Sequence, residues 1–227
     1  HMKSKYWQNY NLGKKKLIKK IIKFNKKNKV NYFEDLHFNH TRDILALGLS
    51  LANPQNKKFK VLDYGSNPLS LANLSNKINL KKIHFTIYDP FLKDKLDKIH
   101  INQVKYKIIN NEQVIFNEKY NLIHYGSSIQ YQNDFLKKLK ILNLNYAKYI
   151  IFTHTPFSTK GSYRTKQTNH SNLEQNIYSL SSLINILDEK NFKLIFKSRN
   201  DDKYKACKIE KFKTYSLNLL FKKCLKN

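Results

Sequence analysis

The chain has few cysteines, few glycines and no long apolar run, and these shortages disfavour several classes of protein and of site. Cys207 and Cys224 are the only cysteines among 227 residues, and they stand far apart without a ligand pattern beside them. This disfavours a disulfide framework or a zinc site, and it suits a reducing cytoplasm. No apolar run approaches the roughly 20 residues that a membrane-spanning helix needs. His1 and Met2 are typical of a cloning remnant, and the N-terminus is too rich in Lys and Asn for a secretory signal.

Acidic residues are also scarce, so the formal net charge is +27, from 43 Lys and Arg against 16 Asp and Glu. Such a charge attracts nucleic acid, anionic membranes or phosphorylated substrates. Arginine, which makes bidentate phosphate contacts, occurs only as Arg42, Arg164 and Arg199. The lysines are scattered, and the chain is rich in Asn, Ile and Tyr, as an AT-rich genome would encode. Genome composition is therefore favoured as the cause, and nucleic acid stays open as a partner without being favoured.

The N-terminal part predicts helices. Residues 6–27 combine lysines with apolar positions near helical spacing. Such a helix packs on the domain or covers its pocket, and a position on a membrane surface is the less favoured alternative. Thr41 is expected to be the N-cap of a second helix that runs to about Leu51. We therefore expect a helical extension over residues 3–56 and one main domain over residues 57–227.

In the main domain, apolar segments of strand length alternate with helical segments. The last strand is expected to be antiparallel and to lie at or near an edge. This alternation predicts an α/β fold with a doubly wound, mostly parallel sheet. The expected strands are 59–64, 84–89, 104–109, 120–125, 149–153, 192–198 and 215–221, and the expected helices are 70–76, 133–142 and 179–190.

The first strand ends in a turn suited to a nucleoside. Gly65 follows Val61-Leu62-Asp63-Tyr64 and allows close backbone approach, and Asp89 ends the next expected strand. A carboxylate in that place can accept hydrogen bonds from ribose hydroxyls. A dinucleotide fingerprint would need three glycines, whereas this turn has one, so S-adenosylmethionine is favoured over NAD. The alternative is a doubly wound domain with an ordinary turn at this point.

Three motifs carry a resemblance to a known family. They are Val61–Ser66 with Tyr88-Asp89-Pro90-Phe91, then Ile123–Tyr131, and then Phe152–Ser158 with Asn176–Ser179. Over about residues 40 to 223 the chain resembles class I, Rossmann-like methyltransferases. More narrowly, it resembles a little-characterised bacterial family of methyltransferases often encoded near surface-polysaccharide genes. Ser66-Asn67-Pro68 replaces the extra glycines that are usual in the first turn.

The resemblance implies S-adenosylmethionine as the cofactor and assigns residues to it. One set lines the methionine side, an acid holds the ribose, and two serines lie at the end of the fourth strand, where the alternative is ordinary loop caps. No metal site is expected. The implied cofactor-binding residues are Asp63, Gly65, Ser66, Asp89, Pro90, Ser127 and Ser128.

His154 is the candidate catalytic residue. It is expected to follow the fifth strand, where a neutral imidazole could take a proton from a substrate hydroxyl as the methyl group transfers. The alternative for His154 is a structural or pocket-lining role, and His124 is expected in the core. Candidate substrate contacts in or near loops are Tyr131, Arg164 and His170, each with a plain surface or packing role as the alternative.

Together these patterns predict a methyltransferase that uses S-adenosylmethionine and acts on a small molecule or glycan, with oxygen as the expected acceptor atom. One alternative is an RNA methyltransferase, which the charge favours, although no base-reading motif such as Asn-Pro-Pro-aromatic is present. The other is a non-catalytic binding protein that retains the fold. The acceptor, the oligomeric state and the use of a general base stay open.

Overall fold

The computed structural model describes residues 36–52, 59–66, 68–75, 78–90, 101, 104–168, 173–200 and 204–224, with backbone alone for 36–42, 69 and 73. The helix expected over residues 6–27 lies outside this part. The chain forms two compact units, one up to Ile123 and one from His124 onward. No helix within the described part is long and apolar enough to cross a membrane.

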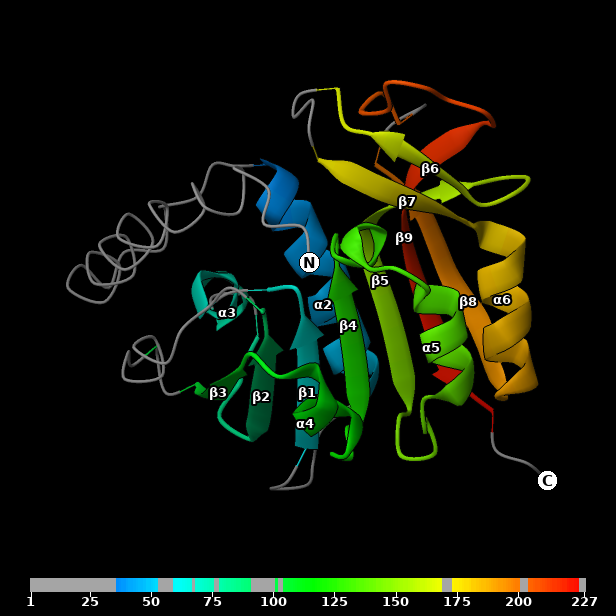
Figure 1. The fold of residues 1–227 in the computed structure, drawn as a ribbon. Helices are drawn as coiled ribbons and strands as arrows, with labels where there is room; N and C mark the ends of the chain where they lie inside the picture. Colours follow the sequence, from blue (N-terminus) through cyan, green and yellow to red (C-terminus); the bar gives the residue numbers. More distant parts are fainter. Residues whose placement is uncertain are drawn as a thin grey trace. The chain divides into compact units, whose positions relative to one another are not determined.

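The first unit alternates strands and helices (Figure 1). Its strands lie in the order β3-β2-β1, and both neighbouring pairs are parallel. The elements are α2 (Leu36–Ala52), β1 (Phe59–Tyr64), α3 (Pro68–Ser75), β2 (Ile83–Tyr88), β3 (Lys105–Ile109), α4 (Glu112–Phe116) and the first residues of β4 (Leu122–Gly126).

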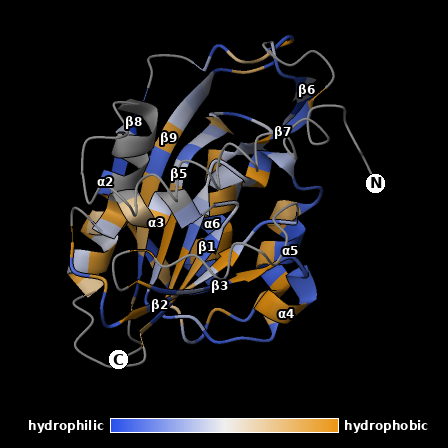
Figure 2. Ribbon diagram, turned by 90° about the vertical axis from the view of Figure 1, so that its left-hand side faces the viewer, coloured by the Kyte–Doolittle hydropathy of each residue, from blue (hydrophilic) through white to orange (hydrophobic). Residues whose placement is uncertain are grey.

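Strands β1 and β2 form the core of this unit because apolar side chains predominate in both (Figure 2). In each strand every residue except the second is buried, as is typical of parallel strands that are covered on both faces. Asp63 pairs with Ile87 and Tyr64 with Tyr88. The residues that follow the two strands therefore leave the sheet at the same edge.

The second unit holds a mixed sheet in which β5 pairs with β7 in parallel and with β9 in antiparallel orientation. β9 also pairs antiparallel with β8, and β6 with β7. An aromatic cluster of Tyr125, Phe135 and Phe152 packs beside this sheet. The elements are the end of β4, η2 (Ile129–Tyr131), α5 (Phe135–Ile141), β5 (Tyr149–Ser158), β6 (Tyr163–Lys166), β7 (Glu174–Ser179), α6 (Leu180–Glu189), β8 (Phe192–Arg199) and β9 (Thr214–Lys223).

The predicted α/β class is confirmed, including the antiparallel last strand, which lies between β5 and β8. Two local predictions are wrong. Thr41 is not an N-cap, because the backbone is helical from Leu36 onward. The fifth strand does not end at Thr153 but runs to Ser158, because β9 supplies pairing partners beyond that point.

Candidate functional site

A tight turn at Gly65 joins the ends of β1 and β2 in the first unit. Gly65 has a φ of 74°, a conformation that residues with a side chain rarely adopt. Its N–H donates to the carbonyl of Tyr88 at 2.7 Å, so the chain leaves β1 close to the end of β2. The turn predicted from the sequence therefore brings the backbone of Gly65 close to that of Tyr88, at the carboxyl edge of the strands.

Acidic residues lie on both sides of this turn. Asp63, near the end of β1, is fully buried, and Asp89, directly after β2, is 6% exposed. The N–H of Asp89 donates to the carbonyl of Ile109 at 3.2 Å, which anchors it to β3 as well. Ser66 is buried beside the turn, and Pro90 is exposed. The structure thus brings Asp63, Gly65 and Asp89 to one edge of neighbouring strands, as predicted.

The same edge includes Glu112, which was not among the residues predicted from the sequence. The hydroxyl of Tyr64 donates to Glu112 Oε1 at 2.7 Å, and the rings of Tyr64 and Tyr88 have centroids 4.4 Å apart. Burial, followed by the Glu112 carboxylate, raises the pKa of Tyr88 to about 12. Glu112 opens α4, whose N-cap Asn111 accepts from the N–H of Gln113. An Asn just before a helix is the signal that could have revealed this turn.

In the second unit, the end of β4 is held in a strained conformation. Ser127 has a φ of 49°, and such a backbone in a residue other than glycine costs about 1–3 kcal/mol. Its N–H donates to the carbonyl of Thr153 on β5 at 2.9 Å. The amide of Gln130 donates to both the carbonyl and the hydroxyl of Ser127, each at 3.0 Å. The half-buried Ser127 and Ser128 therefore lie in a turn that its surroundings fix.

Two neighbours explain the residue types in this turn. Gln130 is 2% exposed, and its Oε1 has no hydrogen-bond partner within the described part of the chain. Gln130 therefore offers a buried acceptor in this turn, and it was not among the residues predicted from the sequence. A Cβ on Gly126 would lie 3.1 Å from Cε1 of His124, which favours glycine there. His124 is fully buried and hydrogen-bonds Thr153 Oγ1 through Nε2 at 2.7 Å, so its predicted place in the core is confirmed.

His154 lies inside β5 at a β-bulge and does not follow the strand, contrary to the prediction. The pairing with β9 shifts between Phe152 and Thr155, so that two residues oppose one. His154 has a φ of 52°, and its N–H donates to Asn218 Oδ1 at 3.0 Å. Its ring Nδ1 hydrogen-bonds Ser216 Oγ at 3.2 Å. The bulge therefore holds the half-buried imidazole in a defined orientation.

Amide and hydroxyl groups of β8 and β9 support this bulge. Asn218 donates from Nδ2 to Ser198 Oγ at 3.0 Å and to Asn200 Oδ1 at 2.7 Å. Asn200 donates in turn to Ser216 Oγ at 3.2 Å. Asn218 and Ser216 are buried. The backbone and the ring of His154 thus rest on one connected network.

The candidate substrate residues fall into three situations. Tyr131 is half-buried, and its hydroxyl accepts from Nε2 of Gln167 at 2.7 Å. Arg164 is exposed on β6 and forms an ion pair with Glu174 of β7. His170 lies outside the described residues. Tyr131 therefore lies in a polar environment, and Arg164 takes part in an ion pair at the surface.

Comparison with solved structures identifies the fold of the chain. No protein-family model matches the chain, and no curated protein matches its sequence. The N-terminal domain of EvdMO1, solved with SAH bound, has a TM-score of 0.54 at 8% identity and covers 81% of each chain. The 1,6-didemethyltoxoflavin-N1-methyltransferase of Burkholderia thailandensis, solved with its substrate and S-adenosylhomocysteine, has a TM-score of 0.54 at 11% identity, over 92% of this chain and 88% of that one.

Coclaurine N-methyltransferase, solved with N-methylheliamine and SAH, has a TM-score of 0.53 at 11% identity, over 81% of this chain and 72% of that one. These likenesses confirm the Rossmann-like methyltransferase fold. At such low identities they carry no further conclusion about activity.

Proposed function

We propose that the protein is a methyltransferase that uses S-adenosylmethionine to methylate a small molecule or glycan, at an oxygen atom. The observation that carries the proposal is the edge formed by Gly65 and Asp89, a tight backbone turn beside an almost fully buried carboxylate at the ends of neighbouring parallel strands. Open α/β sheets bind ligands at this edge. The methyltransferase fold of the solved neighbours supports the same reading.

The residues of the first unit fit the cofactor by their chemistry. Asp89 would accept hydrogen bonds from the two ribose hydroxyls, and the turn at Gly65 lets the ligand approach the backbone. Asp63 and Ser66 would line the methionine side, with Pro90 next to Asp89. Bound S-adenosylmethionine supplies a methyl group on a sulfonium. Ser127 and Ser128 stay proposed contacts of the same ligand.

His154 is proposed as the general base. Its imidazole would take the proton of the acceptor hydroxyl when that oxygen receives the methyl group. Ser216 holds the ring through Nδ1, and Asn218 holds the backbone. Tyr131, Arg164 and His170 are proposed acceptor contacts. The narrower acceptor class, a surface-polysaccharide precursor, and a cytoplasmic setting rest on the motif resemblance and the cysteine usage.

Calorimetric titration of S-adenosylhomocysteine tests the cofactor proposal. Asp89→Ala should weaken binding about a hundredfold, because two hydrogen bonds to a charged group are lost. Asp43→Ala, which removes an exposed carboxylate from α2, is the matched control and should bind as the wild type does. Absence of binding by the wild type would favour a non-catalytic protein. Salt-sensitive binding of RNA together with RNA methylation would favour the nucleic-acid alternative.

A further inference from the structure

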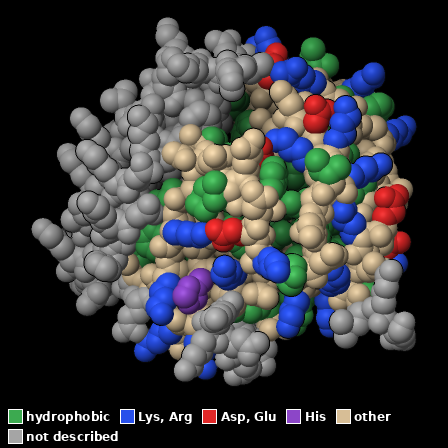
Figure 3. Space-filling model, turned by 60° about the horizontal axis from the view of Figure 1, so that its bottom comes forward, with side chains coloured by type: hydrophobic (Ala, Val, Ile, Leu, Met, Phe, Trp, Pro, Cys, Tyr) green, Lys and Arg blue, Asp and Glu red, His purple; other side chains and the backbone are tan. Residues whose placement is uncertain are grey.

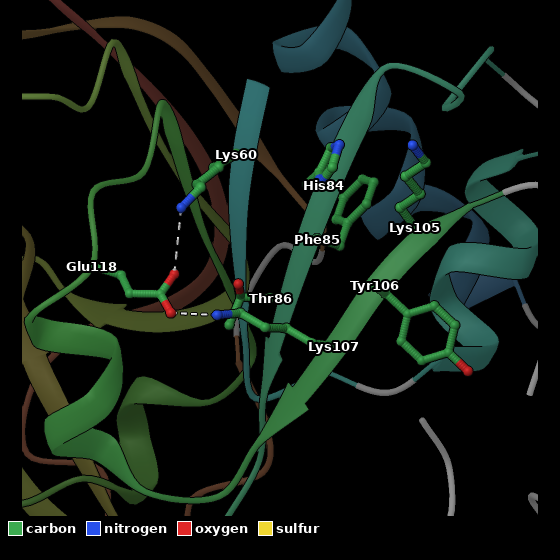
Figure 4. Close-up of a pocket in the computed structure, with 8 residues that line it drawn as sticks. All are labelled: Lys60, His84, Phe85, Thr86, Lys105, Tyr106, Lys107 and Glu118. Atoms are coloured by element: carbon green, nitrogen blue, oxygen red, sulfur yellow. Dashed lines mark hydrogen bonds and ion pairs between the residues drawn. The ribbon is translucent and has the colours of Figure 1, made fainter. Parts of the chain in front are cut away.

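The first unit also contains a hollow of about 290 Å³ that the proposed function does not use (Figure 4). Its charged lining consists of Lys60, Lys105, Lys107 and Glu118, with His84 between the lysines. Lys60 and His84 are the second residues of β1 and β2, and Lys105 is the first residue of β3. These three residues lie at the amino ends of their strands, and Lys60 is about 15 Å along β1 from the turn at Gly65.

The strand register places Lys60, His84 and Lys105 in one row. Lys60 is opposite His84, and His84 is opposite Lys105. Residues opposite one another on neighbouring strands share a face of the sheet, so the two lysines flank the histidine across about 10 Å. All three side chains are exposed. The row therefore places two ammonium groups on one face of the sheet.

Only part of this charge is neutralised by the protein. Glu118 forms ion pairs with Lys60 at 3.9 Å and with Lys107, drawn as dashed lines in Figure 4. Within the described residues Lys105 has no acidic partner. Three lysine ammonium groups and one carboxylate therefore line the hollow, and together they carry two net positive charges. On the face that Figure 3 shows, most of the charged side chains are Lys or Arg, with few acidic groups between them.

We propose that this hollow binds the phosphate group of a small phosphorylated molecule. A phosphate monoester carries a charge of about −1.5 to −2 at neutral pH, which matches the two uncompensated lysines. Lysine ammonium groups bind phosphate as point charges without the fixed geometry that arginine imposes. The volume is close to the lower end of the range for small-molecule sites, which suits one phosphate with a short carrier. Because neither Gly65 nor Asp89 lines the hollow, this inference does not depend on the methyltransferase proposal.

Calorimetry and NMR with ribose 5-phosphate and inorganic phosphate test the site at constant ionic strength, with ribose as the uncharged match. The informative variant is the double substitution Lys105→Gln with Lys107→Gln. The matched control is Lys81→Gln with Lys82→Gln, two exposed lysines in the turn before β2 that do not line the hollow. Circular dichroism checks that each variant is folded.

The proposal predicts saturable binding of ribose 5-phosphate and of phosphate, no binding of ribose, and a shift of the His84 ring signals on titration. The hollow variant should bind at least about tenfold more weakly, and the control should be unchanged. If binding weakened equally in both variants, it would depend only on the overall charge of the protein, and the proposal would be overturned. So would the absence of saturation. Binding of a twelve-nucleotide RNA through these lysines, without binding of ribose 5-phosphate, would assign the hollow to nucleic acid and also overturn it.

Discussion

Asn218 offers the sharpest test of the bulge that holds His154. Replacing it with Leu keeps a buried side chain of similar size but removes the acceptor of the His154 N–H and both donors of the side-chain amide. A buried N–H left without a partner costs about 1–3 kcal/mol, and each neutral hydrogen bond contributes about 1 kcal/mol. Apolar packing by Leu offsets part of this loss. We expect the free energy of unfolding to fall by about 3 kcal/mol.

Urea unfolding at pH 7, followed by circular dichroism, measures this change. Asn133→Leu replaces an exposed asparagine in the same unit and should leave the free energy of unfolding within about 0.5 kcal/mol of the wild type. A loss below 1 kcal/mol in Asn218→Leu would refute the reasoning, since the amide would then contribute little to the bulge.

Three further results are expected. Burial raises the pKa of Tyr88 to about 12 in the folded protein, against 10 when exposed, so the unfolded chain loses this proton first as the pH rises. The free energy of unfolding should therefore fall between pH 10 and pH 12. In urea unfolding, Tyr88→Phe should lessen this fall, whereas replacing the exposed Tyr146 by Phe should not. Gly65→Ala should lower stability by about 1 kcal/mol, seen in thermal melts, because alanine disfavours a φ of 74°; an unchanged melting temperature would contradict a rigid turn. His154→Ala should slow release of S-adenosylhomocysteine from S-adenosylmethionine with an acceptor present while leaving cofactor affinity intact, and a fully active variant would remove it as the base.

Much of the fold could be predicted because apolar side chains predominate in most strands, as in β1 and β2. β1 lies at residues 59–64, as predicted, and β2 is displaced by a single residue. The hairpin of β6 and β7 was missed because Tyr-Arg-Thr-Lys and Glu-Gln-Asn-Ile-Tyr-Ser are mostly polar. These strands form through pairing with each other and with β5, which is tertiary information.

The candidate site was predictable where a local pattern fixes it. Gly65 and Asp89 follow consecutive strands, so the sequence alone brings them to one edge. The bulge at His154 was not predictable, because it depends on Asn218 lying opposite in β9, 64 residues away. A proline in a sequence argues against a central strand, yet Pro156 lies within β5 and pairs with Ser216 of β9.

A crystal structure of the protein with S-adenosylhomocysteine tests the central claim most directly. The account predicts the ribose hydroxyls on the carboxylate of Asp89 and the ligand against the backbone of Gly65. Side chains of the protein itself filling that space, or the ligand bound elsewhere, would contradict it.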